Sequence, residues 1–400
     1  MRRWPLCIFL ITLVLSWPIA AQALTVSGQV LDQTGQGVAG AIISDEINAV
    51  ASGADGGFKL ATKPGRVVSF TAPAGYTAPA KWWWPSERAA EAKLSLALEA
   101  RQTSAAPLVA LLADPHLFDE QSDSANYPLR AEAAQVPLKT WRRVAGELKE
   151  LSPALTIVAG DLCFDADMGD ELHAKTQLAM AARAMSDLPA PARALPGNHD
   201  VRYSGGKVDT TLWRRALGPA RQVFLLPGAA FILLDNVGLA QKVEAKHTLC
   251  GKLPDEALTW LHRILPLLPN EYELYVVSHY PPATPIAGSN PLHGGSLVRS
   301  QLNKDLALRD ADQSFRMVAK LLLDRNLAAF IHGHEHAGHT TTILARQSFQ
   351  VIGLPALCGG WWQGDRKWGP YKFPPAYALL RLKSAPQGPA PELKIIEVKY

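Results

Sequence analysis

Residues 192–200 read ARALPGNHD, an apolar run that ends in the polar tetrapeptide Gly197-Asn198-His199-Asp200. A chain of this composition is expected to contain Gly-Asn-His-Asp by chance about once in a thousand cases. A short apolar run predicts a buried strand, and in an open α/β sheet ligand sites form beyond the carboxyl ends of the strands. The tetrapeptide therefore marks a candidate functional site at a strand end.

Four further polar clusters follow apolar runs in the same way. They are Asp114-Pro115-His116 after residues 107–113, Gly160-Asp161 after 155–159, Ser278-His279 after 274–277, and Gly333-His334-Glu335-His336 after 328–331. Stretches with helical spacing, at residues 140–151 and 313–324, alternate with these runs. This alternation predicts an α/β layered fold with all five clusters at the carboxyl edge of its strands.

The order of the five clusters resembles the calcineurin-like metallophosphoesterase superfamily over residues 107 to about 340. The resemblance implies a four-layer α/β (α+β) sandwich of two facing β-sheets flanked by helices, with a dinuclear metal centre at the strand ends. It implies one ion held by Asp114, His116, Asp161 and His336, and a second held by Asp161, Asn198, His279 and His334, with Asp161 bridging the two. Such mixed imidazole and carboxylate ligands suit Mn, Fe or Zn.

The resemblance also implies catalytic roles for His199 and Asp200. His199 is expected to contact the substrate phosphate or protonate the leaving group, and Asp200 to orient it. Hydroxide held between the two ions is the expected nucleophile for phosphate ester hydrolysis. Because the complete Gly-His-x-His cluster resembles bacterial branches rich in phosphodiesterases, diesters are slightly favoured over monoesters. His332 and His339 are expected to support the ligands from behind or to lie at the surface.

The chain outside this region is expected to contain three other segments. Residues 1–23 carry Arg2 and Arg3, an apolar stretch and Ala21-Gln22-Ala23, which is typical of a secretory signal peptide. An uncleaved membrane anchor is the alternative. Residues 24–98 have short alternating runs between Gly-rich turns, which predicts a small all-β sandwich resembling transthyretin-like or carboxypeptidase-regulatory modules. The catalytic domain is expected at 107–345, and a β-rich C-terminal segment at 346–400.

Composition limits the partners and the compartment. The 400 residues are 48% hydrophobic and 19% charged, and Arg2 and Arg3 contribute two units of the formal net charge of +4. Such a charge gives no electrostatic case for nucleic-acid binding. The resemblance implies a small-molecule phosphate ester as the partner. Secretion, in a bacterial periplasm, is expected, with no transmembrane domain after signal cleavage; the oligomeric state is open. Of Cys163, Cys250 and Cys358, the last two are the expected disulfide pair.

Two tryptophan clusters support a rival hypothesis. Trp82-Trp83-Trp84 could stack on sugars or face a membrane, and Trp361-Trp362 could line the substrate pocket or close the core. The rival protein would be an exported glycan- or envelope-binding protein built on an inactive metallophosphoesterase scaffold. The intact set of seven ligand residues disfavours it, because a scaffold without catalysis could lose ligands at no cost.

Overall fold

The computed structural model describes residues 23–102, 104–118, 130–204, 207–239, 249–282, 313–344, 347–359, 367–368, 371–383 and 389–399. The signal peptide expected at residues 1–23 lies outside these ranges except for Ala23, and Trp361 and Trp362 lie outside them as well. Among the helices of the described ranges, none combines the length and the apolar character needed to cross a membrane.

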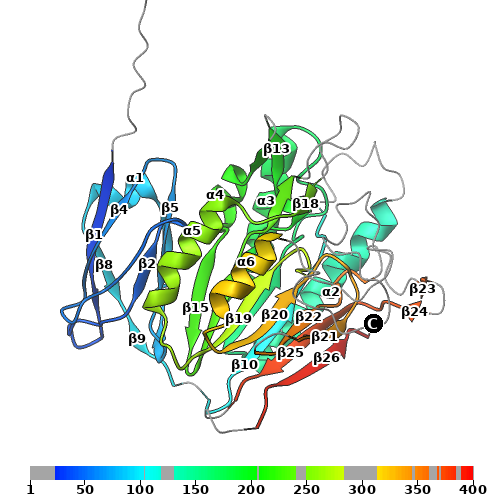
Figure 1. Ribbon diagram of the computed structural model, residues 1–400. Helices are drawn as coiled ribbons and strands as arrows, with labels where there is room; N and C mark the ends of the chain where they lie inside the picture. Colours follow the sequence, from blue (N-terminus) through cyan, green and yellow to red (C-terminus); the bar gives the residue numbers. More distant parts are fainter. Residues whose placement is uncertain are drawn as a thin grey trace, which may run out of the picture.

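Residues 24–97 form two small sheets around their own apolar core (Figure 1). One sheet has the order β4-β1-β8 and the other β3-β2-β5-β7. Their strands are β1 (Leu24–Leu31), β2 (Ile42–Ser44), β3 (Ala49–Ala51), β4 (Gly57–Thr62), β5 (Val67–Thr71), β7 (Trp83–Pro85) and β8 (Leu94–Ala97), with helix α1 (Ser86–Glu91) before β8 and a short pair of β6 (Tyr76–Thr77) and β9 (Glu99–Ala100). In β4 the alternating sequence buries Phe58 and Leu60 and exposes Lys59, as expected for a strand with one buried face.

Two larger sheets face each other in the rest of the molecule. The first has the order β12-β11-β10-β25-β26, built from β10 (Leu108–Leu112), β11 (Leu155–Ala159), β12 (Ala192–Leu195), β25 (Ala376–Arg381) and β26 (Glu392–Glu397). The second has the order β15-β16-β19-β20-β22-β21, built from β15 (Gln222–Leu226), β16 (Ala229–Leu233), β19 (Glu273–Ser278), β20 (Leu327–His332), β21 (His339–Ile343) and β22 (Phe349–Gly353). Buried side chains of both sheets, including Leu111, Ile157, Phe231 and Ile331, form one core between them.

Helices cover the outer face of each sheet (Figure 1). Helices α2 (Arg130–Leu151), α3 (Glu171–Met185) and α4 (Thr211–Leu217) share a core with the first sheet, and α5 (Asp255–Ile264) and α6 (Gln313–Leu322) share one with the second. Shorter elements are the pairs β13 (Arg202–Ser204) with β14 (Lys207–Asp209), β17 (Val237–Leu239) with β18 (Leu249–Gly251) and β23 (Lys367–Trp368) with β24 (Tyr371–Lys372), and 3₁₀ turns at Asn198–Asp200 and Leu265–Leu267. The predicted four-layer α/β sandwich is confirmed.

Strand direction determines where the polar clusters lie. Strands β10, β11 and β12 are parallel, and so are β16, β19, β20 and β22. Each of the five clusters follows the carboxyl end of one of these strands, namely β10, β11, β12, β19 and β20. The carboxyl ends of parallel strands share one edge of a sheet, so three clusters meet at the first sheet and two at the second.

The C-terminal segment is part of the larger sandwich. Strand β25 pairs antiparallel with β10 and β26 pairs with β25, while β22 pairs parallel with β20. Residues before and after the expected boundary at 345 contribute strands to both sheets. The boundary therefore does not separate two structural units.

The small N-terminal sandwich is joined to the larger one by buried polar contacts. The Glu46 side chain is fully buried and accepts hydrogen bonds from Arg214 Nε (2.6 Å) and from the backbone N–H groups of Ala220 (2.7 Å) and Arg221 (3.1 Å). Trp260 Nε1 donates to Ser44 Oγ at 2.8 Å. Figure 1 shows this sandwich beside β15 and α5.

Two of the three adjacent tryptophans contact cationic side chains of the chain itself. The Arg193 guanidinium lies 3.8 Å from the centre of the Trp82 ring, and Lys81 Nζ lies 4.1 Å from that of Trp83. Trp84 packs against the core of the small sandwich. All three side chains are half-buried, so they stabilise the chain's own packing.

Candidate metal centre

Side chains from both sheets converge on Asp161. Its Oδ2 lies 3.6 Å from His116 Nε2, on the same sheet, and 3.2 Å from His279 Nε2, on the facing sheet. One carboxylate oxygen of Asp161 therefore lies beside imidazole nitrogens from both sheets.

The other expected ligands form one group on each side of Asp161. On one side, His116 Nε2 lies 3.1 Å from His336 Nε2, which lies 3.4 Å from Asp114 Oδ1. On the other side, Asn198 Oδ1 lies 3.0 Å from His279 Nε2 and 3.0 Å from His334 Nδ1. The structure thus brings all seven side chains together, in the two sets that the family resemblance implies.

Five of the seven residues have a left-handed backbone conformation. Their φ angles are +51° at Asp114, +44° at His116, +52° at Asp161, +69° at His334 and +57° at His336. Among the described residues that are not glycine, only Glu46 and Ser152 also have positive φ. A side chain in this region costs free energy that is typically retained at functional sites, where the surrounding structure imposes it.

Glycines in the clusters make room for ligand carboxylates of neighbouring loops. A Cβ on Gly197 would collide with the carboxylate and the backbone nitrogen of Asp161, and a Cβ on Gly333 would lie 2.6 Å from Asp114 Oδ2. These close approaches explain why glycine precedes both Asn198 and His334.

Backbone groups hold several ligand side chains in place. His279 Nδ1 donates to the Ala159 carbonyl at 2.9 Å, so Nε2 is the ring nitrogen that faces Asp161. The backbone N–H of His334 donates to Asp114 Oδ2 at 2.9 Å, and that of His199 donates to Asp161 Oδ1 at 2.9 Å. The donor atoms are therefore oriented before any ion binds.

Burial and charge shift the pKa values of the centre in opposite directions. Burial holds the pKa of His116 and His334 well below the ordinary value, which keeps both imidazoles neutral, as coordination requires. Burial alone would raise the pKa of Asp161, but the charges of His279 and His199 hold it well below its usual range. Burial likewise opposes the charged form of His279, whose pKa Asp161 nevertheless raises to about 9.

The carboxylate beside His199 is Asp167, not Asp200. His199 Nδ1 lies 3.1 Å from Asp167 Oδ1. The centres of the His199 and His116 rings are 5.1 Å apart. Asp200 instead accepts three backbone N–H groups, those of Leu162 (3.1 Å), Cys163 (2.8 Å) and Gly197 (2.8 Å). The carboxylate in contact with the His199 ring is thus Asp167, and Asp200 ties the loop after β11 to the loop after β12.

Sequence reasoning missed three neighbours of the centre. They are Asp167, Tyr280 and Cys358. The centres of the Tyr280 and His334 rings are 4.0 Å apart, and Cys358 Sγ lies 3.8 Å from His336 Nδ1. Tyr280 directly follows His279 in the sequence, and this adjacency was its only signal. Cys358 is a buried free thiol, as is Cys163, so the expected Cys250–Cys358 disulfide is wrong.

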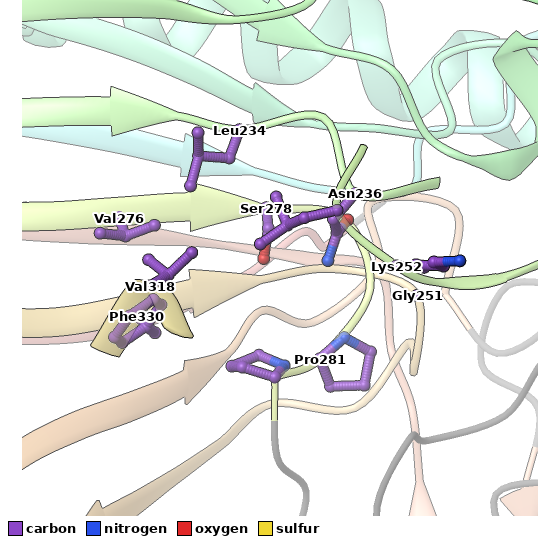
Figure 2. A pocket seen from close by; sticks show the side chains of 11 residues that line it. Leu234, Asn236, Gly251, Lys252, Val276, Ser278, Pro281, Val318 and Phe330 are labelled. Atoms are coloured by element: carbon purple, nitrogen blue, oxygen red, sulfur yellow. The ribbon is translucent and has the colours of Figure 1, made fainter. Parts of the chain in front are cut away.

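A small hollow lies beside the carboxyl ends of β16 and β19 (Figure 2). It is bounded by strand-end residues Asn236 and Ser278, by Pro281, and by Val318 of α6. Asn236 Oδ1 accepts the backbone N–H groups of His279 (3.1 Å) and Tyr280 (3.0 Å), so this wall also fixes the His279 loop.

Comparison with known proteins identifies a family for this chain. Residues 107–338 match the calcineurin-like phosphoesterase family. The 3',5'-cyclic adenosine monophosphate phosphodiesterases CpdA of Escherichia coli K12 and O157:H7 are each 26% identical over 175 residues, which are 42% of this chain and 54% of each relative. The chain thus spans about half the length of the curated relatives it matches.

Solved structures with similar folds include two phosphatases. A dimetal phosphatase from Danio rerio aligns with a TM-score of 0.44 at 15% identity, over 69% of this chain and 93% of its own. The purple acid phosphatase PPD1 from yellow lupin aligns with a TM-score of 0.45 at 12% identity, over 94% of this chain and 69% of its own. With the family match covering more than half of its residues, this chain belongs to the calcineurin-like phosphoesterase family.

Proposed function

We propose that this protein hydrolyses phosphate esters at a dinuclear metal centre, with phosphodiesters favoured over monoesters. The observation that carries the proposal is the convergence of seven nitrogen and oxygen ligands, in two sets that share Asp161. The strained backbone at five of the seven positions supports it, because such strain persists where function requires the geometry.

The donor set fits two transition-metal ions. His116 Nε2 and His336 Nε2 face each other at 3.1 Å, close enough for one ion to bind both. Four imidazoles, two carboxylates and one amide suit Mn, Fe or Zn. When bound, two such ions lower the pKa of a water molecule to near neutrality and offset the negative charge on phosphate oxygens.

His199 is the proton donor in this proposal. Burial opposes its charged form, but Asp161 and the hydrogen bond to Asp167 raise the pKa of His199 to about 9. The imidazole therefore carries a proton at neutral pH and can protonate the leaving oxygen of an ester. An alkoxide is a poor leaving group without a proton, so such a donor contributes on the order of 10²- to 10⁴-fold in rate.

Two observations favour a diester. The curated relatives with a partial match bear the name of a cyclic nucleotide phosphodiesterase. In addition, Arg202, the arginine closest in sequence to His199, donates to the carbonyl groups of Gly169 (3.3 Å) and Asp170 (2.6 Å). A guanidinium that donates to backbone carbonyls is not available for the paired hydrogen bonds that would bind the second negative charge of a monoester.

Hydrolysis of two nitrophenyl substrates tests the proposal. Protein supplied with Mn²⁺ or Zn²⁺ is expected to cleave bis(p-nitrophenyl) phosphate faster than p-nitrophenyl phosphate. Asp161→Asn is expected to remove both activities and to lower metal content by two ions per chain, whereas Asp187→Asn, at an exposed position, leaves both unchanged. A metal-loaded wild type without activity on a broad ester panel would contradict the proposed function.

Secretion into a bacterial periplasm is proposed from the leader sequence. Cleavage after Ala23 is the expected processing event, and N-terminal sequencing of protein from a periplasmic fraction measures it directly. The rival glycan-binding function receives no support from Trp82 and Trp83, because both rings contact cations of this chain.

A further inference from the structure

A second cluster of ligand-type side chains lies on the turn that carries His334 and His336. It consists of His332, the last residue of β20, Glu335 in the turn, and His339, the first residue of β21. One ligand atom from each lies within 4.8 Å of the other two. None of the three belongs to the seven residues of the dinuclear centre, so this cluster is a separate set of donors.

His332 is fully buried and presents an unused nitrogen. Its Nδ1 lies 2.9 Å from the Gly333 carbonyl oxygen, which can only accept, so the proton is on Nδ1 and the lone pair on Nε2. That Nε2 is shielded from solvent and has no hydrogen-bond partner among the described residues. A buried acceptor without a partner is unfavourable unless a ligand completes it, and a backbone carbonyl on the opposite nitrogen is the usual arrangement behind a metal-bound histidine.

Glu335 and His339 complete the set. His339 Nε2 lies 3.1 Å from Glu335 Oε2. The centres of the His332 and His339 rings are 5.2 Å apart. The Glu335 side chain is only 4% exposed and that of His339 12%. A cation shared by this carboxylate and the two imidazoles would balance the carboxylate's charge inside the protein.

The cluster packs against Gly353 of β22, where the absence of a side chain leaves room for the imidazoles. Gly353 is the register partner of His332 in the parallel pair β20–β22 and of His339 in the antiparallel pair β21–β22. A Cβ on Gly353 would lie 2.5 Å from Cδ2 of His339, so any side chain there would displace the imidazole. Both histidines are thus held beside one strand that has no side chain at this position.

We propose that His332, Glu335 and His339 bind a third metal ion, for which Zn²⁺ is the best-suited probe. Two imidazoles and one carboxylate form a known zinc ligand set, with a fourth position for water. The ion would join the end of β20 to the start of β21. It would thereby fix the turn between them, which carries two ligands of the dinuclear centre, so its role is structural.

Metal analysis of the full chain tests the third site. Protein equilibrated with Zn²⁺ and freed of excess metal is expected to hold close to three ions per chain. Both His339→Gln and Glu335→Gln are expected to lose one ion, whereas His262→Gln, at an exposed position on α5, loses none. Circular dichroism shows whether each variant is folded. If one variant misfolds, the other still tests the site.

Asp161→Asn separates the third site from the dinuclear centre. This variant is expected to retain one ion, which the double variant Asp161→Asn/His339→Gln then loses. If folded His339→Gln and Glu335→Gln both hold as many ions as the wild type, the third site does not exist, and the three residues form only a hydrogen-bonded group. That outcome leaves the dinuclear proposal intact, since it depends on the loss caused by Asp161→Asn.

Discussion

Nδ1 of His199 and Oδ1 of Asp167 lie 3.1 Å apart, although neither the order of the motifs nor their spacing pointed to Asp167. Asp167 is in the loop between β11 and α3, and His199 is in the 3₁₀ turn after β12. A carboxylate on one ring nitrogen fixes the ring's orientation and stabilises its protonated form, which leaves the other nitrogen available to a leaving group.

Asp167→Asn is expected to lower activity on alkyl phosphodiesters by roughly tenfold to a hundredfold while metal content stays unchanged. The carboxylate raises the pKa of His199, so its loss lowers that pKa and the proton is lost at lower pH. The alkaline limb of the pH–rate profile, set by a pKa of about 9 in the wild type, is therefore expected to move toward neutrality. An unmoved limb would show that Asp167 does not act through His199.

His199→Ala is expected to affect substrates according to their leaving group. Nitrophenolate leaves without a proton, so the rate on bis(p-nitrophenyl) phosphate is expected to fall less than tenfold. An alkyl diester requires protonation and is expected to lose on the order of 10²-fold or more. Equal losses on both substrates, measured as kcat, would assign His199 to phosphate binding instead.

Gly197→Ala is expected to remove metal and activity together. The new Cβ would lie 2.8 Å from Cγ of Asp161, so the bridging carboxylate must shift. We expect at least a hundredfold loss of activity and reduced metal content by elemental analysis. Gly146→Ala is the matched control, because nothing lies within 4 Å of a Cβ there and alanine stabilises an exposed helix site by up to about 1 kcal/mol. A Gly197→Ala protein with normal metal content would contradict the tight fit.

Glu46→Gln is expected to weaken the junction between the small sandwich and the larger one. It breaks an ion pair whose carboxylate is fully buried, and such losses cost about 3 kcal/mol in the free energy of unfolding. Urea unfolding followed by tryptophan fluorescence measures this change. Glu91→Gln removes an exposed pair with Arg88 and is expected to cost less than about 1 kcal/mol. Equal effects of the two substitutions would mean that Glu46 does not hold the junction.

Removal of metal is expected to lower Tm as well as activity. Ions that bind only the folded protein stabilise it by about 4 kcal/mol at a thousandfold excess over Kd. Dialysis against a chelator is therefore expected to lower Tm by several degrees, and added Mn²⁺ or Zn²⁺ to restore it. The same treatment of Asp161→Asn is expected to shift Tm less, and an equal shift would place the stabilising ions elsewhere.

Much of the fold could be predicted because buried parallel strands have a clear sequence signal. The runs at 155–159 and 192–195 are β11 and β12 to the residue. Helix α2 begins ten residues before the predicted stretch at 140, since Pro137 within it obscures the helical pattern. The pairing of β25 with β10 could not be predicted, because hydrogen bonds between strands more than 260 residues apart leave no local pattern.

The candidate ligands could be named because each belongs to a motif, whereas their supporting residues do not. Asp167 and Cys358 approach the centre only through tertiary folding. His332 was expected behind the ligands or at the surface, and β20 extends through it and buries it completely. Local sequence cannot specify where a strand ends to within one residue, and that residue decides whether the imidazole is solvated.

The pairing of β25 with β10 also sets the order of events during synthesis. Strand β10 carries Asp114 and His116 at its end, and until residue 381 has been made it has a neighbour on one side only. A nascent chain that already contains every ligand therefore still has an exposed edge at the strand on which two of them depend. The strand that carries these two ligand residues is therefore enclosed within its sheet only after chain well beyond the last ligand, His336, has been made.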